Sequence, residues 1–101
     1  MVFRVVILET AGREYRDIVD YLARVLLSPQ AARSFALSFR EQVRLVSRAP
    51  EARPLSALPE VAALGYRPCP VKGYLFLYRV RGDRVEIAHV FHQSQDYARH
   101  L

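Results

Sequence analysis

Polar side chains able to exchange protons gather near the C-terminal end of the chain. The segment HVFHQSQDY at residues 89–97 follows an apolar stretch typical of a β-strand and holds two histidines, two glutamines, an acid and a tyrosine. Histidine side chains can serve as general acids or bases, which makes His92 a candidate for proton transfer. Because a core strand needs no such group to fold, we expect this segment at a surface that carries function.

The charge of the chain favours an anionic partner. The net charge is +5, and all of the 15 basic residues except Lys72 are arginine. A planar guanidinium binds phosphate oxygens in pairs, which suits a nucleic acid or an acidic protein. Arginine is also abundant in proteins from GC-rich genomes, so the charge supports a polyanionic partner without naming it.

Size and composition exclude several classes of protein. The 101 residues predict a single domain, residues 1–101, with one small core. No apolar run is long enough to cross a membrane, and no membrane partner is expected. The single cysteine, Cys69, lies between two prolines and is expected to be a neutral filler, so a reducing cytoplasm is the predicted location. The spacing of histidines and cysteine predicts no metal site, no glycine-rich phosphate loop appears, and no cofactor is expected.

The chain must position this C-terminal segment with a few short elements. Residues 2–8 predict a strand buried on both faces. Apolar residues then recur at helical spacing from Ala11 to Leu26. Ser28 and Pro29 suit the start of a second helix, which Pro50 ends.

The second half of the chain predicts a sheet. Residues 50–64 are rich in proline and predict an irregular connection with a helical turn near 59–61, and strands follow at 65–71, 73–81 and 84–92. The predicted fold is α+β in the order β-α-α-β-β-β, with an antiparallel helical hairpin on one face of a small, mainly antiparallel sheet.

The two faces of the last hairpin can be assigned from its turn. With Gly82 and Asp83 as a two-residue loop, Arg81 lies opposite Arg84 and Arg79 opposite Glu86. One face is expected to pack on the helices: Tyr74, Phe76, Tyr78, Val80, Val85, Ile87, His89 and Phe91. The other is expected to be an open, working face that receives a partner chain: Leu75, Leu77, Arg79, Glu86, Ala88, Val90 and His92.

The order of these motifs resembles the RelE/ParE superfamily of toxins from bacterial type II toxin–antitoxin modules, which includes plasmid stabilisation proteins. The matching features run from the first strand through the helix start at Ser28-Pro29-Gln30-Ala31-Ala32 to Gly65-Tyr66-Arg67, VKGYLFLYRV and HVFHQSQDY. The resemblance implies a small basic toxin that arrests growth. It also implies a cognate, acidic antitoxin that covers the sheet and helices with an extended or helical segment and alone contacts operator DNA.

The superfamily implies two targets. RelE-like members cleave messenger RNA on the ribosome, whereas ParE-like members have no nuclease site and inhibit DNA gyrase. The helix start and the hairpin ending in a histidine and an aspartate favour the ParE side, while the residue inventory keeps the RelE side open. A third alternative is an inactive toxin-like co-regulator.

The resemblance also implies site residues. By position, Arg67, His92 and Tyr97 would be catalytic in a nuclease, as phosphate clamp, acid or base, and proton donor. Contacts to substrate or partner are predicted for Lys72, Arg79, Gln95 and Asp96. The chain departs from the family where Gln93-Ser94-Gln95 replaces a basic tail and where residues 50–64 hold only Glu51, Arg53 and Glu60 as charged residues.

Structural roles are open alternatives for the same residues. His92 can be a hydrogen-bonded residue at a strand end, and Tyr97 can anchor the tail by packing. Arg79 and Glu86 can form a simple cross-strand ion pair. His89 is expected to be structural.

Overall fold

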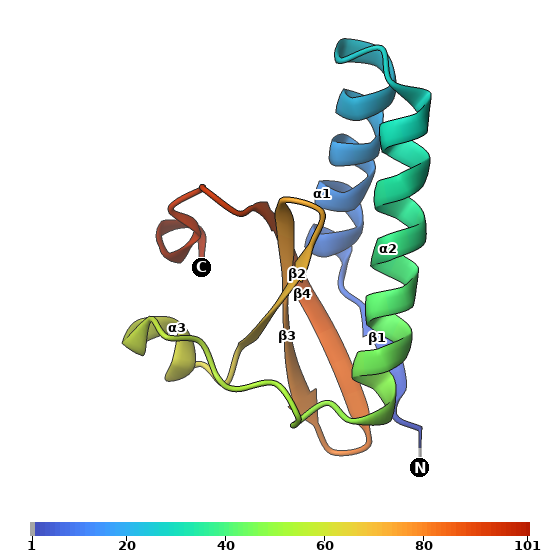
Figure 1. The fold of residues 1–101 in the computed structure, drawn as a ribbon. Helices are drawn as coiled ribbons and strands as arrows, with labels where there is room; N and C mark the ends of the chain where they lie inside the picture. Colours follow the sequence, from blue (N-terminus) through green and yellow to red (C-terminus); the bar gives the residue numbers. More distant parts are fainter. Residues whose placement is uncertain (1) are drawn as a thin grey trace.

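A computed structural model describes residues 2–101 and shows a four-stranded sheet with a helical hairpin packed on one face (Figure 1). The strand order is β1-β4-β3-β2, with β1 parallel to β4 and the other pairs antiparallel. The strands are β1 (Arg4–Ile7), β2 (Arg67–Val71), β3 (Tyr74–Arg81) and β4 (Arg84–His92). The helices are α1 (Glu9–Asp20), the π-helix η1 (Tyr21–Val25), α2 (Pro29–Arg48), α3 (Pro59–Ala62) and the 3₁₀ helix η2 (Tyr97–His100). This order confirms the predicted α+β fold, including the helical turn before β2.

The start of α2 follows the predicted capping pattern. Pro29 occupies the first turn, and the Ser28 hydroxyl accepts a hydrogen bond from the Ala31 N–H at 3.2 Å. From there the helix aligns Phe35 and Phe39 on the sheet, where the Phe39 ring lies 5.2 Å from the Phe76 ring and 4.7 Å from the Tyr15 ring of α1. These aromatic contacts join both helices to the sheet in one core.

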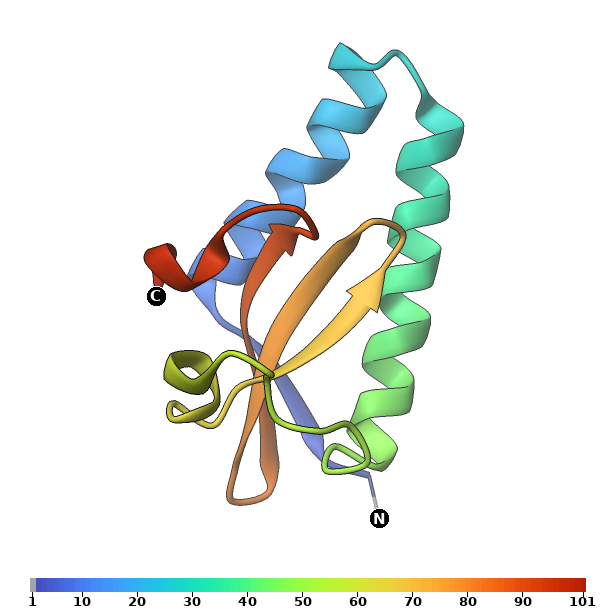
Figure 2. The same ribbon diagram turned by 60° about the vertical axis from the view of Figure 1, so that its left-hand side comes forward.

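The tip of the helical hairpin is apolar and exposed. The chain leaves α1 through η1, where the Leu26 N–H donates to the Tyr21 carbonyl at 3.0 Å, and Leu27 then takes a positive φ of 51°. The helical spacing predicted that Val25 and Leu26 share the buried stripe, but they are 64% and 53% exposed. That prediction was wrong because the hairpin extends beyond the end of the sheet (Figure 2) and leaves them no core to reach.

The two edges of the sheet differ in chemistry. β1 was predicted to be buried on both faces, but it pairs only with β4, and Ile7 is 49% exposed. β2 forms the other edge, and Pro68 and Pro70 occupy two of its five positions. Proline has no N–H and is tolerated in a sheet where its nitrogen faces away from the neighbouring strand. The outer edge of β2 therefore lacks two hydrogen-bond donors.

A β-bulge changes the second half of β4. The register follows the prediction from Arg81 and Arg84 to Tyr78 and Ile87, but Leu77 then pairs with His89, so Ala88 is an extra residue. Paired residues share a face, so one inserted residue reverses every side chain beyond it. The face prediction was therefore wrong for the residues after the bulge. Val90 and His92 lie on the helix side, and His89 and Phe91 lie on the other side.

The face opposite the helices is partly covered. Val61 of α3 and Tyr97 of η2 pack there against Leu75, Leu77 and Phe91 in a second core. Figure 1 shows α3 and the C-terminal segment on the side of the sheet away from α1 and α2. The predicted open face is thus open only toward the β3–β4 turn. Within residues 2–101, no helix is long and apolar enough to cross a membrane.

Candidate functional site

His92 ends β4 and is held by the turn that follows it. Its Nδ1 atom accepts the Ser94 N–H at 3.1 Å and lies 2.7 Å from the Ser94 hydroxyl oxygen. The Gln95 N–H donates to the His92 carbonyl at 3.0 Å, and the imidazole meets the Tyr74 ring edge-on at 5.2 Å. Since Nδ1 is an acceptor, the neutral ring carries its proton on Nε2, which is the atom free to exchange protons.

Arg67, at the start of β2, lies away from His92 along the sheet. It pairs with Tyr78 on one side of β3, whereas His92 pairs with Tyr74 on the other side. Tyr74 and Tyr78 are four residue steps apart along β3, which is about 13 Å at the usual rise per residue. The Arg67 guanidinium donates to the Arg53 carbonyl and so holds the linker between α2 and α3.

Tyr97 packs on the face of the sheet that His92 does not share. Its ring stacks on Phe91 with centroids 5.6 Å apart, and His89 stacks on Phe91 at 4.9 Å. Tyr97 therefore anchors the C-terminal segment by packing. Arg67, His92 and Tyr97 lie at three separate places, and none of the hydrogen bonds and ion pairs in residues 2–101 joins His92 to an arginine or lysine.

The four predicted contact residues divide between the two ends of the sheet. Lys72 lies in the β2–β3 turn with a positive φ of 50°, and the next residue, Gly73, accepts the Gln93 N–H at 2.9 Å. Gln95 and the exposed Asp96 follow in the same region, where Asp96 pairs with Arg99 at 3.5 Å. The fourth residue, Arg79, lies toward the β3–β4 turn.

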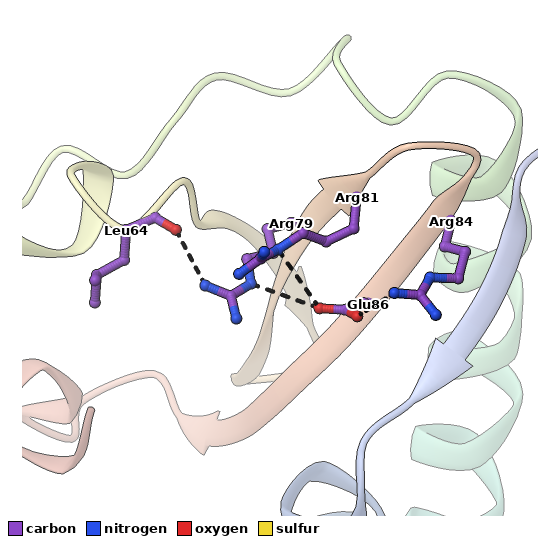
Figure 3. Close-up of polar contacts among 5 residues, drawn as sticks. All are labelled: Leu64, Arg79, Arg81, Arg84 and Glu86. Atoms are coloured by element: carbon purple, nitrogen blue, oxygen red, sulfur yellow. Dashed lines mark hydrogen bonds and ion pairs between the residues drawn. The ribbon is translucent and has the colours of Figure 1, made fainter.

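Arg79 belongs to an arginine cluster formed by Arg79, Arg81, Arg84 and Glu86 (Figure 3). The Glu86 carboxylate lies 3.6 Å from Arg79 and 3.9 Å from Arg81, and accepts a hydrogen bond from Arg84 at 3.1 Å. The predicted cross-strand pair of Arg79 and Glu86 is confirmed. The Arg79 guanidinium also covers the Tyr66 ring at 5.0 Å, a cation–π contact.

A groove of about 620 Å³ opens between α1, α2 and the end of β1. Its lining is mainly apolar with three charged residues: Ile7, Leu8, Glu9, Gly12, Tyr15, Arg16, Ala36, Phe39, Arg40 and Val43. A Cβ atom built on Gly12 would meet Arg16 Nη1 at 3.5 Å, an ordinary contact, so packing within the described chain does not require glycine there. Sequence patterns did not predict this groove. The feature that could have pointed to it is Gly12, a glycine inside the amphipathic helix α1.

Cys69 shows the chemistry of a core residue. Its side chain is fully buried, and burial raises the pKa of the thiol above its ordinary value. A protonated thiol is a poor nucleophile, which fits the predicted role as filler. Across residues 2–101, no three histidine, cysteine or acidic side chains are grouped as metal ligands.

Comparison with known proteins gives a family and a fold. Residues 5–97 match the family described as the ParE toxin of the type II toxin–antitoxin system, parDE. No curated protein sequence matches the chain. The fold is similar to a structure described as the chromosomal ParDE toxin–antitoxin system from P. aeruginosa, with a TM-score of 0.71 and 21% identity over 90% of this chain and 96% of that one.

A second solved structure has the same fold. It is described as the toxin–antitoxin complex RelBE2 from Mycobacterium tuberculosis, and it matches with a TM-score of 0.62 and 20% identity over 91% of this chain and 99% of that one. The predicted superfamily resemblance is thereby confirmed at the level of fold from both of its branches.

Proposed function

Because this chain belongs to the ParE toxin family of type II toxin–antitoxin systems, we propose that it arrests growth by inhibiting DNA gyrase and is neutralised in the cytoplasm by a cognate antitoxin. The family membership supports the gyrase target. The observation that carries this choice over mRNA cleavage is the separation of Arg67, His92 and Tyr97 on the sheet.

Cleavage of RNA by its 2′-hydroxyl needs a base, a cation and an acid around one phosphate. Here the Arg67 guanidinium is engaged by the linker. His92 lies on the same face of the sheet as Arg67 but about 13 Å away along the strands, and Tyr97 is stacked on Phe91 on the opposite face. A ribosome-dependent nuclease would require these three side chains to converge on its target. Binding to a protein target requires no such convergence.

For the antitoxin we propose the groove between α1, α2 and β1. Its apolar wall, with Tyr15, Phe39 and Val43, suits the apolar side chains of a helical or extended segment. Arg16 and Arg40 in the same lining suit acidic residues of that segment. Gly12 has no side chain, and the nearest atom to a Cβ built there is the end of the Arg16 side chain at 3.5 Å, so a partner chain could approach α1 closely.

The test is induced expression in a bacterial host, followed by two measurements on the same culture. A gyrase supercoiling assay is expected to show inhibition with cleaved plasmid–gyrase complexes, while messages on translating ribosomes stay intact. His92→Ala is the matched variant, and it is expected to be as toxic as the parent.

Two outcomes would contradict the proposal. Cuts within translated messages that disappear in His92→Ala would establish the nuclease alternative. Normal growth with active gyrase would support an inactive co-regulator that acts with the antitoxin.

A further inference from the structure

Three arginines form a cross-strand row on the face of the sheet opposite the helices. Arg4 of β1 pairs with Arg84 of β4, which pairs with Arg81 of β3. Their neighbours Val5 and Val85 pack in the core under the helices, so the arginines point to the other face. We call Arg4, Arg84 and Arg81 the arginine row.

The positive charge of the row exceeds the negative charge of the carboxylates that pair with it. Like charges directly opposite each other on neighbouring strands are destabilising. The Glu86 carboxylate pairs with Arg81 and Arg84 of the row, and it also pairs with Arg79, the next arginine on the same face of β3 (Figure 3). The Arg79 Nε atom is buried and lacks a hydrogen-bond partner within residues 2–101. Asp83, in the adjacent turn, takes part in none of the ion pairs found there.

We propose that the arginine row binds the phosphate backbone of duplex DNA. Neighbouring strands lie about 4.8 Å apart, so the row spans about 10 Å across three strands. Glu86 is only 14% exposed. It accepts a hydrogen bond from Arg84, which is 41% exposed, and lies 3.9 Å from Arg81, which is 53% exposed. Arginines held in this way are already oriented to bind phosphate oxygens in pairs.

The surroundings of the row favour a duplex over a single strand. Proteins that bind single strands stack the bases on exposed aromatic rings. Tyr66, beneath Arg79, is 8% exposed, and Phe91, beneath Tyr97, is 4% exposed. Tyr97 itself is half-buried, but it packs on Phe91 and Leu75, away from the β3–β4 turn where the row lies. A row that offers cations without a stacking surface suits a paired backbone, which carries about one charge per 1.7 Å.

This inference rests on the proposed function for its setting, because gyrase holds duplex DNA while it works. It deepens that function by giving the toxin a second contact in the gyrase–DNA complex. Binding of operator DNA through the antitoxin would be a separate property.

The test is the salt dependence of binding to a short, fluorescently labelled duplex of mixed sequence, measured by anisotropy with the purified chain. Each phosphate contact contributes about 0.9 to the slope of log K against log salt. We expect Arg84→Gln and Arg81→Gln each to lower the slope by about 1 and to weaken all duplex sequences alike. Arg33→Gln, exposed on α2 in the opposite layer, removes the same charge and is expected to leave the slope unchanged.

Several results would overturn the inference. One is an equal fall in slope for Arg33→Gln, which would mean diffuse attraction by net charge. Another is a row variant, Arg84→Gln or Arg81→Gln, that binds duplex DNA as the parent does but no longer binds a single-stranded RNA or a polyglutamate peptide. That result would assign the row to the ligand whose binding is lost. If Arg84→Gln unfolds, Arg84→Lys retains the charge without the paired hydrogen bonds, and duplex affinity between those of the parent and Arg81→Gln is expected.

The supercoiling assay separates this inference from the proposed function. If the chain binds duplex DNA through the row but does not inhibit gyrase, the proposed function is contradicted and the inference stands. If the chain inhibits gyrase but its duplex binding does not depend on salt, the inference is contradicted and the proposed function stands.

Discussion

Tyr78 links the linker after α2 to the centre of the sheet. Its side chain is fully buried, and its hydroxyl donates to the Pro50 carbonyl at 2.7 Å. Burial disfavours the charged phenolate and raises the pKa of Tyr78 to about 12, against an ordinary value of 10.0. The stability of the fold therefore depends on pH through the Tyr78 side chain.

The raised pKa of Tyr78 predicts a loss of stability at alkaline pH. Unfolding frees the phenol to ionise, so its contribution is complete below pH 10 and lost as pH rises toward 12, about 3 kcal/mol in all. Chemical denaturation across this range is expected to show the loss, and Tyr78→Phe is expected to remove it. Tyr78→Phe also leaves the Pro50 carbonyl unpaired, which costs about 1–3 kcal/mol at neutral pH. Tyr21→Phe, exposed at the hairpin tip, is the control, and an unchanged alkaline loss in Tyr78→Phe would refute the assignment.

Alanine substitutions at Arg67 and His92 are expected to affect stability differently. Arg67→Ala removes a charged donor from the Arg53 carbonyl and is expected to lower the free energy of unfolding by about 1.5–3 kcal/mol. His92→Ala is expected to change stability little, because His92 is exposed and bonds only to its own turn. Thermal unfolding and growth arrest measured together decide this. If His92→Ala folds but no longer arrests growth, the proposal that His92 is not needed for toxicity is contradicted and the catalytic alternative for His92 is supported.

At the scale of elements, α1 completes the sheet where β1 stops. β1 ends at Ile7, so β4 has no parallel partner beyond Ile87. Glu14 of α1 fills this place, since its carboxylate accepts the Val90 N–H at 2.9 Å and lies 3.3 Å from His89 Nδ1. A helix side chain thus replaces a strand in the hydrogen bonding of β4.

This replacement predicts a graded effect of substitutions at Glu14. Glu14→Ala leaves the Val90 N–H without its acceptor and is expected to cost about 1–3 kcal/mol. Glu14→Gln keeps an acceptor oxygen and is expected to lose less. Amide hydrogen exchange at Val90 should accelerate in the alanine variant, with the central amide of Phe76 as the internal reference, and an unchanged rate would contradict the role of Glu14.

Elements were predictable from sequence where local chemistry defines them. Ser28 and Pro29 mark the start of α2, and Gly82, with a positive φ of 61°, marks the β3–β4 turn. The bulge at Ala88 was not predictable, because one extra residue among small and apolar neighbours leaves the alternating pattern readable in either register. His92 was correctly expected at the end of the last strand, but whether the candidate site residues converge depends on strand order, which no local pattern encodes.

The whole molecule presents two separate surfaces. The groove lined by Tyr15 and Phe39 lies among the helices and the end of β1, while the arginine row lies on the far face of the sheet. An antitoxin segment in the groove would leave the row free unless the partner continues around the sheet edge. Inhibition by the antitoxin and contact with DNA are therefore separable by substitution.

Gly12 offers the sharpest test of the groove. Gly12→Ala is expected to stabilise α1 by about 0.5–1 kcal/mol, because alanine favours the helix and its methyl group makes only an ordinary contact with Arg16 Nη1 at 3.5 Å. The same methyl group occupies groove space, so affinity for the cognate antitoxin is expected to fall. Ser34→Ala on α2, outside the groove lining, is the control for helix propensity alone. If Gly12→Ala raises thermal stability but leaves antitoxin affinity unchanged, the antitoxin does not bind in this groove.

The prolines of β2 also limit how copies of this chain can polymerise. Growth of a fibre by strand addition needs two competent sheet edges, and Pro68 and Pro70 deprive one edge of donors. Within residues 2–101, β1 is the other edge of the sheet and contains no proline. Two copies joined through β1 would form a closed pair about a two-fold axis, with a proline-bearing strand at each end. A toxin released without its antitoxin would therefore stop at a dimer where an unprotected sheet would continue into an aggregate.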